Sequence, residues 1–186
     1  MGTEVQAVKD AGEISLIERK FRLSKWDNIG DLWRVGVNMA LRISDLLSLR
    51  FSQLEGDYLF VYEGKTTKPR RIKINRPARE IIDKRRQMHP GHVYLFQSTA
   101  NRVANMQAKP LSRQYVTSKF SLIGEEMGLN LGTHSMRKTR GHAMFKAGRS
   151  IEEIAKVLNH ASTKDTLRYI GIEQADIDQS YDDFEL

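Results

Sequence analysis

The chain has 186 residues, enough for one domain with a buried core, and it has no cysteine, which excludes disulfides, thiolate chemistry and thiolate metal sites. Its formal net charge is +7 and its pI is about 9.7, so a polyanion such as nucleic acid is its first candidate partner. The sequence does not open with a basic segment followed by an apolar one, as a signal peptide would, and no apolar run approaches the ~18 residues of a membrane-spanning helix. We therefore expect a cytoplasmic protein without a membrane partner.

The first part of the chain predicts two helices. Residues 12–24 form a short amphipathic pattern that could be peripheral to the domain. Residues 27–41 are apolar on so many sides that we expect this helix in the centre of the core. Arg42 comes at its end, and Ser44 starts a new helical phase. An arginine in such apolar surroundings needs a partner, which a salt bridge to Asp45 would supply.

Two strand-like runs follow, at residues 57–63 and 71–75, with β-branched and aromatic residues in partial alternation. The basic turn between them contains a Gly-Lys-Thr sequence, as phosphate-binding loops do. Such a loop also needs a glycine five residues earlier, where this chain has Leu59. We therefore predict a β-hairpin with Lys65 in its turn, a position where a lysine taken alone is usually only solvated.

The hairpin and the helix after it are strongly basic. Pro77 predicts the start of a helix that ends near Met88, and residues 63–90 hold ten Lys or Arg against three acids. Such a surface could follow a DNA backbone, although a merely solvated basic face would have the same composition. His89 and His92 have a ligand-like spacing, but the Pro-Gly turn between them and the lack of a third ligand nearby indicate a loop and no metal site.

A further helix is predicted to start at Ser112 as its N-cap and to end before Gly128. Arg113 and Lys119 lie on its polar side. Contacts of such side chains with phosphates position a protein on DNA without reading its sequence. The residues that we predict to make these contacts are Lys68, Arg70, Arg71, Arg79, Arg85, Arg113 and Lys119.

The most informative stretch runs from Gly132 to Tyr169. Thr133 is the predicted N-cap of a helix, which places His134 and Arg137 on one face of its first turn. Outward N–H groups and the helix dipole at the same place make a site suited to a phosphate. An isolated His-x-x-Arg is more often a cap and a salt bridge, so the assignment depends on the residues that follow.

Two short helices come next. A serine three residues ahead of an acid starts each of them, at Ser150 and at Ser162, as in a capping box. The first helix ends just before His160, and the second carries Tyr169. We expect the pair to bring this histidine and tyrosine next to the phosphate site. Two short helices of this kind are also typical of a helix-turn-helix, which would make the chain a DNA-binding regulator without chemistry.

The order of these boxes resembles the catalytic half of the tyrosine recombinases, the phage integrase family. In that family a His-x-x-Arg box is followed by a histidine or tryptophan and, nine residues later, by the nucleophilic tyrosine, an interval that His160 and Tyr169 keep. The family's first arginine box is similar to the residues around Arg42, and its hairpin lysine is similar to Lys65. Departures from the common residues occur at Ala40, Ser135, Met136 and Asn159, and none of them is a catalytic group.

The resemblance implies an α+β, mainly helical catalytic domain over residues 1–172, with a small antiparallel β-sheet on one edge. It implies a site-specific DNA recombinase that breaks and rejoins double-stranded DNA through a 3′-phosphotyrosyl intermediate, without metal, ATP or another cofactor. The implied catalytic residues are Tyr169 as the nucleophile with Arg42, Arg137, His134, His160 and Lys65, while Asp45 orients Arg42. A type IB topoisomerase would share this chemistry without exchanging strands between two sites.

The end of the chain reverses the charge. Residues 173–186 hold six acids and no Lys or Arg, yet apolar residues recur at helical spacing, so we predict an amphipathic tail helix. In the family such segments commonly dock on a neighbouring protomer, and the resemblance implies a homo-oligomer on DNA, a synaptic tetramer. We expect the family's N-terminal core-binding domain to be absent, because little more than one helix precedes the helix that ends near Arg42.

Overall fold

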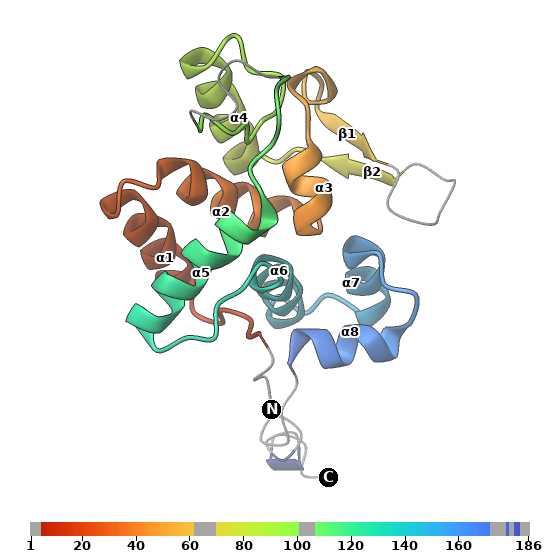
Figure 1. The fold of residues 1–186 in the computed structure, drawn as a ribbon. Helices are drawn as coiled ribbons and strands as arrows, with labels where there is room; N and C mark the ends of the chain where they lie inside the picture. Colours follow the sequence, from red (N-terminus) through yellow and green to blue (C-terminus); the bar gives the residue numbers. More distant parts are fainter. Residues whose placement is uncertain (1–4, 62–69, 101–106, 172–177, 179–180, 183–186) are drawn as a thin grey trace.

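The computed structural model describes residues 5–61, 70–100, 107–171, 178 and 181–182, which form a mainly helical fold with one small sheet (Figure 1). This confirms the predicted fold class. No helix of the described residues is long and apolar enough to cross a bilayer. The elements in chain order are α1 (Ala11–Leu23), α2 (Asp27–Met39), α3 (Ile43–Ser48), the 3-10 turn η1 (Phe51–Gln53), β1 (Tyr58–Val61), β2 (Arg70–Lys73), α4 (Arg76–Met88), α5 (Arg113–Met127), α6 (Ser135–Lys146), α7 (Ile151–Leu158) and α8 (Thr163–Ile170).

The two strands form the antiparallel hairpin expected from the sequence. Tyr58 pairs with Lys73 at one end and Val61 with Arg70 at the other, so both strands are shorter than predicted. The turn at residues 62–69 lies outside the described residues, and with it lie Lys65 and Lys68.

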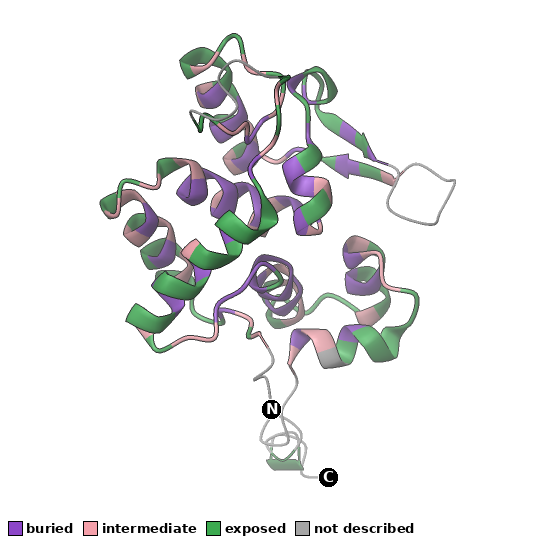
Figure 2. Cartoon of the chain, in the orientation of Figure 1, coloured by how far each residue is buried: buried purple, intermediate pink, exposed green. Residues whose placement is uncertain are grey.

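Helix α6 occupies the middle of the fold, where it packs against α2, α7 and α8 (Figure 1). Two glycines allow this close approach. A side chain at Gly36 of α2 would clash with the Sδ of Met136, and one at Gly141 of α6 would crowd Ile170 and Leu158. As a result of this close packing, most of α6 is buried (Figure 2).

The apolar core is divided into two clusters. The larger cluster includes Ile17 and Phe21 of α1, both fully buried, so the helix that could have been peripheral is part of the core. The smaller cluster under α7 and α8 has far fewer fully buried members, which are Ala40, Ile154, Leu158 and Ile170. Because hydrophobic stabilisation follows buried apolar area, α7 and α8 depend more than the other helices on polar contacts.

One buried carboxylate connects α1, α2 and α4. Asp31, 2% exposed, accepts hydrogen bonds from Arg22 at 2.9 Å, Lys84 at 3.3 Å and Arg85 at 3.1 Å. Arg85 is itself 5% exposed and also donates to the Leu95 carbonyl at 2.8 Å. The structure therefore contradicts the predicted contact of Arg85 with DNA, because its guanidinium is enclosed in the fold.

Candidate active site

Helix α6 brings the histidine and arginine of the His-x-x-Arg box into position. Its N-cap is His134 rather than the predicted Thr133, and the imidazole makes no capping bond to the backbone. The ring is instead directed to the tyrosine, since its Nδ1 lies 3.1 Å from the Tyr169 hydroxyl. Arg137, one turn further along, is 2% exposed. The predicted pairing of His134 and Arg137 at one helix start is thus present, although the cap is one residue later.

Three arginines from different elements hold the carboxyl end of α7. Arg70 at the start of β2 donates to the Val157 carbonyl, and Arg137 of α6 donates to the Leu158 carbonyl. Arg42, the N-cap of α3, donates to the Asn159 carbonyl at 3.4 Å. These carbonyls end a helix and have no partner within it, and the dipole there favours cations. The arginines therefore fix α7 to the sheet, to α6 and to α3.

Arg137 also reaches the end of α2, where it donates to the Ala40 carbonyl. Ala40 closes α2 in the left-handed conformation, with φ of 51°, and Asn159 closes α7 in the same way, with φ of 49°. Both positions were noted above as departures from the common residues. Asparagine tolerates this backbone better than most residues, and here it turns the chain directly into His160.

His160 is held by α8. Its Nδ1 lies 3.1 Å from the Oγ1 of Thr166, and the fully buried Thr166 in turn donates to the Ser162 carbonyl at 3.3 Å. The imidazole ring is 4.7 Å from the Tyr169 ring, centroid to centroid, at an interplanar angle of 84°. The two short helices thus deliver a second histidine to the tyrosine, as the sequence predicted.

Tyr169 is half-buried between the two imidazoles. Burial raises the pKa of its phenol above the ordinary 10, while the charge of Arg137, its hydrogen bond to the phenol and the charge of Arg42 oppose that rise. The tyrosine of the free protein is therefore protonated at neutral pH. To act as a nucleophile it would have to lose this proton in the reaction.

The two histidines have pKa values below the ordinary 6.5. Partial burial of each ring is the largest cause, and the charge of Arg137 is the next for both. Arg113 and Lys138 lower the pKa of His134 further. Both rings are consequently neutral at pH 7. With its proton on Nε2, His134 can accept a proton from the Tyr169 hydroxyl.

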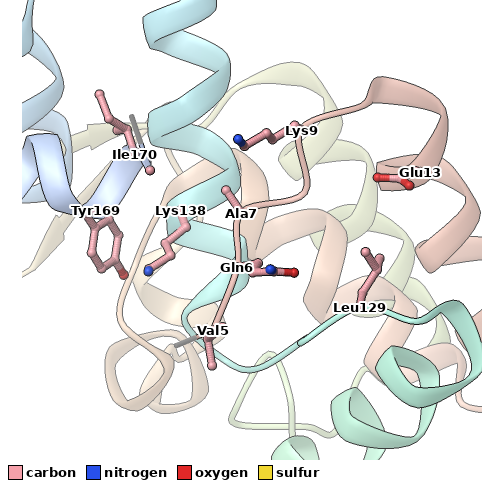
Figure 3. Close-up of a pocket in the computed structure, with 10 residues that line it drawn as sticks. Val5, Gln6, Ala7, Lys9, Glu13, Leu129, Lys138, Tyr169 and Ile170 are labelled. Atoms are coloured by element: carbon pink, nitrogen blue, oxygen red, sulfur yellow. The ribbon is translucent and has the colours of Figure 1, made fainter. Parts of the chain in front are cut away.

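A pocket of about 470 Å³ opens beside Tyr169, between α6 and the segment that precedes α1 (Figure 3). Lys138 lies between the tyrosine and this segment, with its Nζ 5.4 Å from the centre of the phenol ring. The backbone N–H of Val8 anchors the segment by donating to the Thr139 hydroxyl at 2.9 Å. Sequence reasoning missed Lys138, whose one signal was its place directly after Arg137.

Other predicted residues are less closely tied to this site. Asp45 lies in the first turn of α3, where its Oδ1 is 3.4 Å from the Ser44 hydroxyl, and its role beside Arg42 stays a prediction. Arg79 donates to the carbonyls of Leu54 and Gly56 at 2.7 and 2.6 Å, so part of its fork supports the loop before the hairpin.

The remaining basic residues of the predicted DNA set are exposed or half-buried. Arg71 lies 4.7 Å from the centre of the Tyr58 ring, and Lys119 lies 4.1 Å from that of Trp26. Arg113 is exposed and close enough to His134 to shift its pKa. All three remain predicted phosphate contacts.

Comparison with known proteins gives a consistent result. The model of the phage integrase family matches residues 27–175. The probable integrase/recombinase YoeC of Bacillus subtilis (strain 168) is 33% identical over 172 residues, 91% of this chain and 91% of that protein. The fold is similar to that of XerA recombinase, with a TM-score of 0.74 and 16% identity over 98% of this chain and 65% of that one. The Tn1549 transposon integrase in complex with transposon right end DNA gives a TM-score of 0.74 at 15% identity, over 98% of this chain and 67% of that one. The chain thus spans about two thirds of the length of these two solved proteins.

The electrostatics of the site can be tested with an exposed arginine. Arg113 disfavours the protonated form of His134 but is not among the groups that shift His160. Arg113→Gln should therefore raise the pKa of His134 toward its ordinary value and leave that of His160 in place, as measured by NMR titration of the imidazole protons. Arg149→Gln, which removes an exposed arginine paired with Glu153, is the matched control. An unchanged His134, or an equal shift of both histidines, would contradict this description of the site.

Proposed function

The chain belongs to the phage integrase family of tyrosine recombinases, and on that premise we propose that it breaks and rejoins double-stranded DNA through a covalent 3′-phosphotyrosyl link. The observation that carries the proposal is the position of Tyr169. Its hydroxyl lies 3.1 Å from the Nδ1 of His134, its ring lies against His160, and the charge of Arg137 acts on it. A nucleophile, a proton acceptor and cationic donors thus surround one small volume.

The phosphate would be held by Arg42, Arg137 and His160. His160 donates from Nε2 in its protonated form, which the negative charge of the bound phosphate favours. Each guanidinium has five N–H donors. Two hydrogen bonds to helix-end carbonyls fix the plane of the Arg137 guanidinium, and one at 3.4 Å restrains that of Arg42. Donors that are already in place where negative charge develops usually make the greatest contribution to such catalysis. Phosphoryl transfer needs little else from a protein than positioning and charge stabilisation.

The proton transfers follow from the same geometry. As the Tyr169 oxygen forms its bond to phosphorus, His134 accepts the phenol proton, and the bond from phosphorus to the 5′ oxygen breaks. Lys65 is proposed to protonate that departing oxygen, and its place in the hairpin turn lies outside the described residues. The products are a 3′-phosphotyrosyl link and a free 5′-hydroxyl. Attack by the 5′-hydroxyl of a partner strand reverses the step and completes strand exchange.

Two other functions are less consistent with the site. A helix-turn-helix regulator would use α7 and α8 to enter a DNA groove, and it would leave the contact of His134 with Tyr169 without a purpose. A type IB topoisomerase would use the same chemistry at one site. The similarity to integrases and recombinases favours an enzyme that joins two sites.

We also propose the domain organisation and assembly that the sequence suggested. Residues 1–172 form the catalytic domain, and residues 173–186 dock on a neighbouring protomer of a synaptic tetramer on DNA. Most of this tail lies outside the described residues. Its six acids support a protein contact rather than a DNA contact, since DNA would repel them.

The covalent step is tested with a nicked suicide DNA substrate in EDTA, resolved on a denaturing gel. The wild-type chain should form a protein–DNA adduct, and Tyr169→Phe should form none while it still binds the DNA, because only the nucleophilic oxygen is removed. Tyr94→Phe, which removes a hydroxyl near Arg50 at a distance from the site, is the control and should keep the adduct. An adduct that persists in Tyr169→Phe would refute the mechanism.

The role of the tail is tested by a chain that ends at residue 172. If the tail docks between protomers, this chain should still cleave one suicide site, while complexes that hold two DNA sites disappear in analytical ultracentrifugation. The full-length chain on the same DNA is the control. Two-site complexes of undiminished stability would show that the tail does not join protomers.

A further inference from the structure

A second basic site lies next to the catalytic residues. It is a pocket of about 390 Å³ where β2, α6 and α7 meet the end of α2, and its apolar and amide walls include Met39, Ile72 and Asn38. None of the described residues that line it is acidic. Its cationic lining consists of Arg70, Arg71, Lys73, Arg140 and Lys156.

Arg140 is the unusual member of this group. Its Nε is buried and has no hydrogen-bond partner among the residues that the structure describes. The two fully buried arginines differ in this respect, because Arg85 is held by a carboxylate and Arg137 by carbonyls. Burial alone lowers the pKa of Arg140, with no acid to oppose the shift. A buried donor without a partner destabilises the folded state, so a site that keeps one is expected to have a ligand.

The pocket adjoins the active site but shares no catalytic side chain with it. Arg140 comes three residues after Arg137 on α6, a rise of about 4.5 Å along the helix. Arg70 donates to the Val157 carbonyl, next to the Leu158 carbonyl that Arg137 holds. Successive phosphates of one DNA strand advance about 3.4 Å along the helix axis, so a neighbour of the cleaved phosphate falls at this range.

We propose that this pocket binds a phosphate group of the DNA backbone close to the cleaved position. The inference rests on the proposed function in so far as DNA is the substrate. Several guanidinium and ammonium donors without a carboxylate suit a tetrahedral oxyanion with many acceptor atoms. Arg140 supplies the donor from the inner end of the pocket, and Lys73 and Lys156 supply charge at its exposed rim.

The test compares Arg140→Gln with Arg19→Gln, which removes the same charge from the exposed side of α1. Both are made in the Tyr169→Phe chain, so DNA binding is measured by fluorescence anisotropy without the covalent step. Arg140→Gln should lower the affinity several-fold and reduce the slope of log K against log salt by about 0.9, the value for one phosphate contact. Arg19→Gln should leave the slope unchanged. Because binding is read without cleavage, the covalent mechanism can fail while this result stands.

Folding is monitored in the same variants. Without anions, Arg140→Gln should unfold at the same temperature as the parent chain or at a higher one, because a buried donor without a partner has been removed. Lys156→Gln at the rim gives a second variant, which should also reduce the salt slope. Unchanged slopes in both variants would overturn the proposal.

Two further arms separate other ligands. In the first arm, inorganic phosphate is added and the unfolding temperature is measured. If phosphate raises this temperature for the parent but not for Arg140→Gln, and the salt slopes of DNA binding are unchanged, the pocket binds a free anion and the DNA assignment is overturned. In the second arm, residues 173–186 are removed. If their removal raises DNA affinity only when Arg140 is present, the pocket binds the acidic tail. That outcome would overturn the proposal too.

Discussion

The carboxyl end of α7 is the point on which the site depends. Three consecutive carbonyls there accept hydrogen bonds from Arg70, Arg137 and Arg42, which come from β2, α6 and the start of α3. Hydrogen bonds to charged groups are worth about 1.5–3 kcal/mol each, and the cations also offset the negative end of the helix dipole. The apolar cluster under α7 and α8 is small, so these bonds determine where His160 and Tyr169 lie. Two of the three arginines are the ones proposed to hold the phosphate, which means that the groups that position the site also bind its substrate.

Arg70 extends this connection to the hairpin. It stands at the base of the strand that follows the turn with Lys65, and it is bonded to the helix that ends before His160. Strand β2 and the helix that ends before His160 therefore share one anchor. The sequence placed Arg70 among the DNA contacts because it lies in a basic stretch, and the structure shows that it also has a carbonyl partner at α7.

Much of the site was predictable because its signals are local. The interval between His134 and Arg137 is a property of one helix turn, and Ser150 and Ser162 are the N-caps of α7 and α8 as their spacing from an acid predicts. Contacts between distant segments could not be read in this way. The partner of Arg85 is Asp31, 54 residues earlier. Nothing in the basic stretch around Arg85 indicates that its guanidinium is paired with a carboxylate inside the fold. The same holds for the acceptors of Arg137, which lie 97 and 21 residues away, and for the buried donor of Arg140.

The most direct measurement is a crystal structure of the Tyr169→Phe chain bound to a DNA substrate. We predict one backbone phosphate whose non-bridging oxygens accept hydrogen bonds from Arg42, Arg137 and His160. The phenyl ring that replaces the Tyr169 phenol should point its edge at the phosphorus, and the three arginines should still be bonded to the end of α7. A phosphate bound elsewhere, or arginines that leave the α7 carbonyls to reach it, would contradict the proposed dependence of the site on the end of α7.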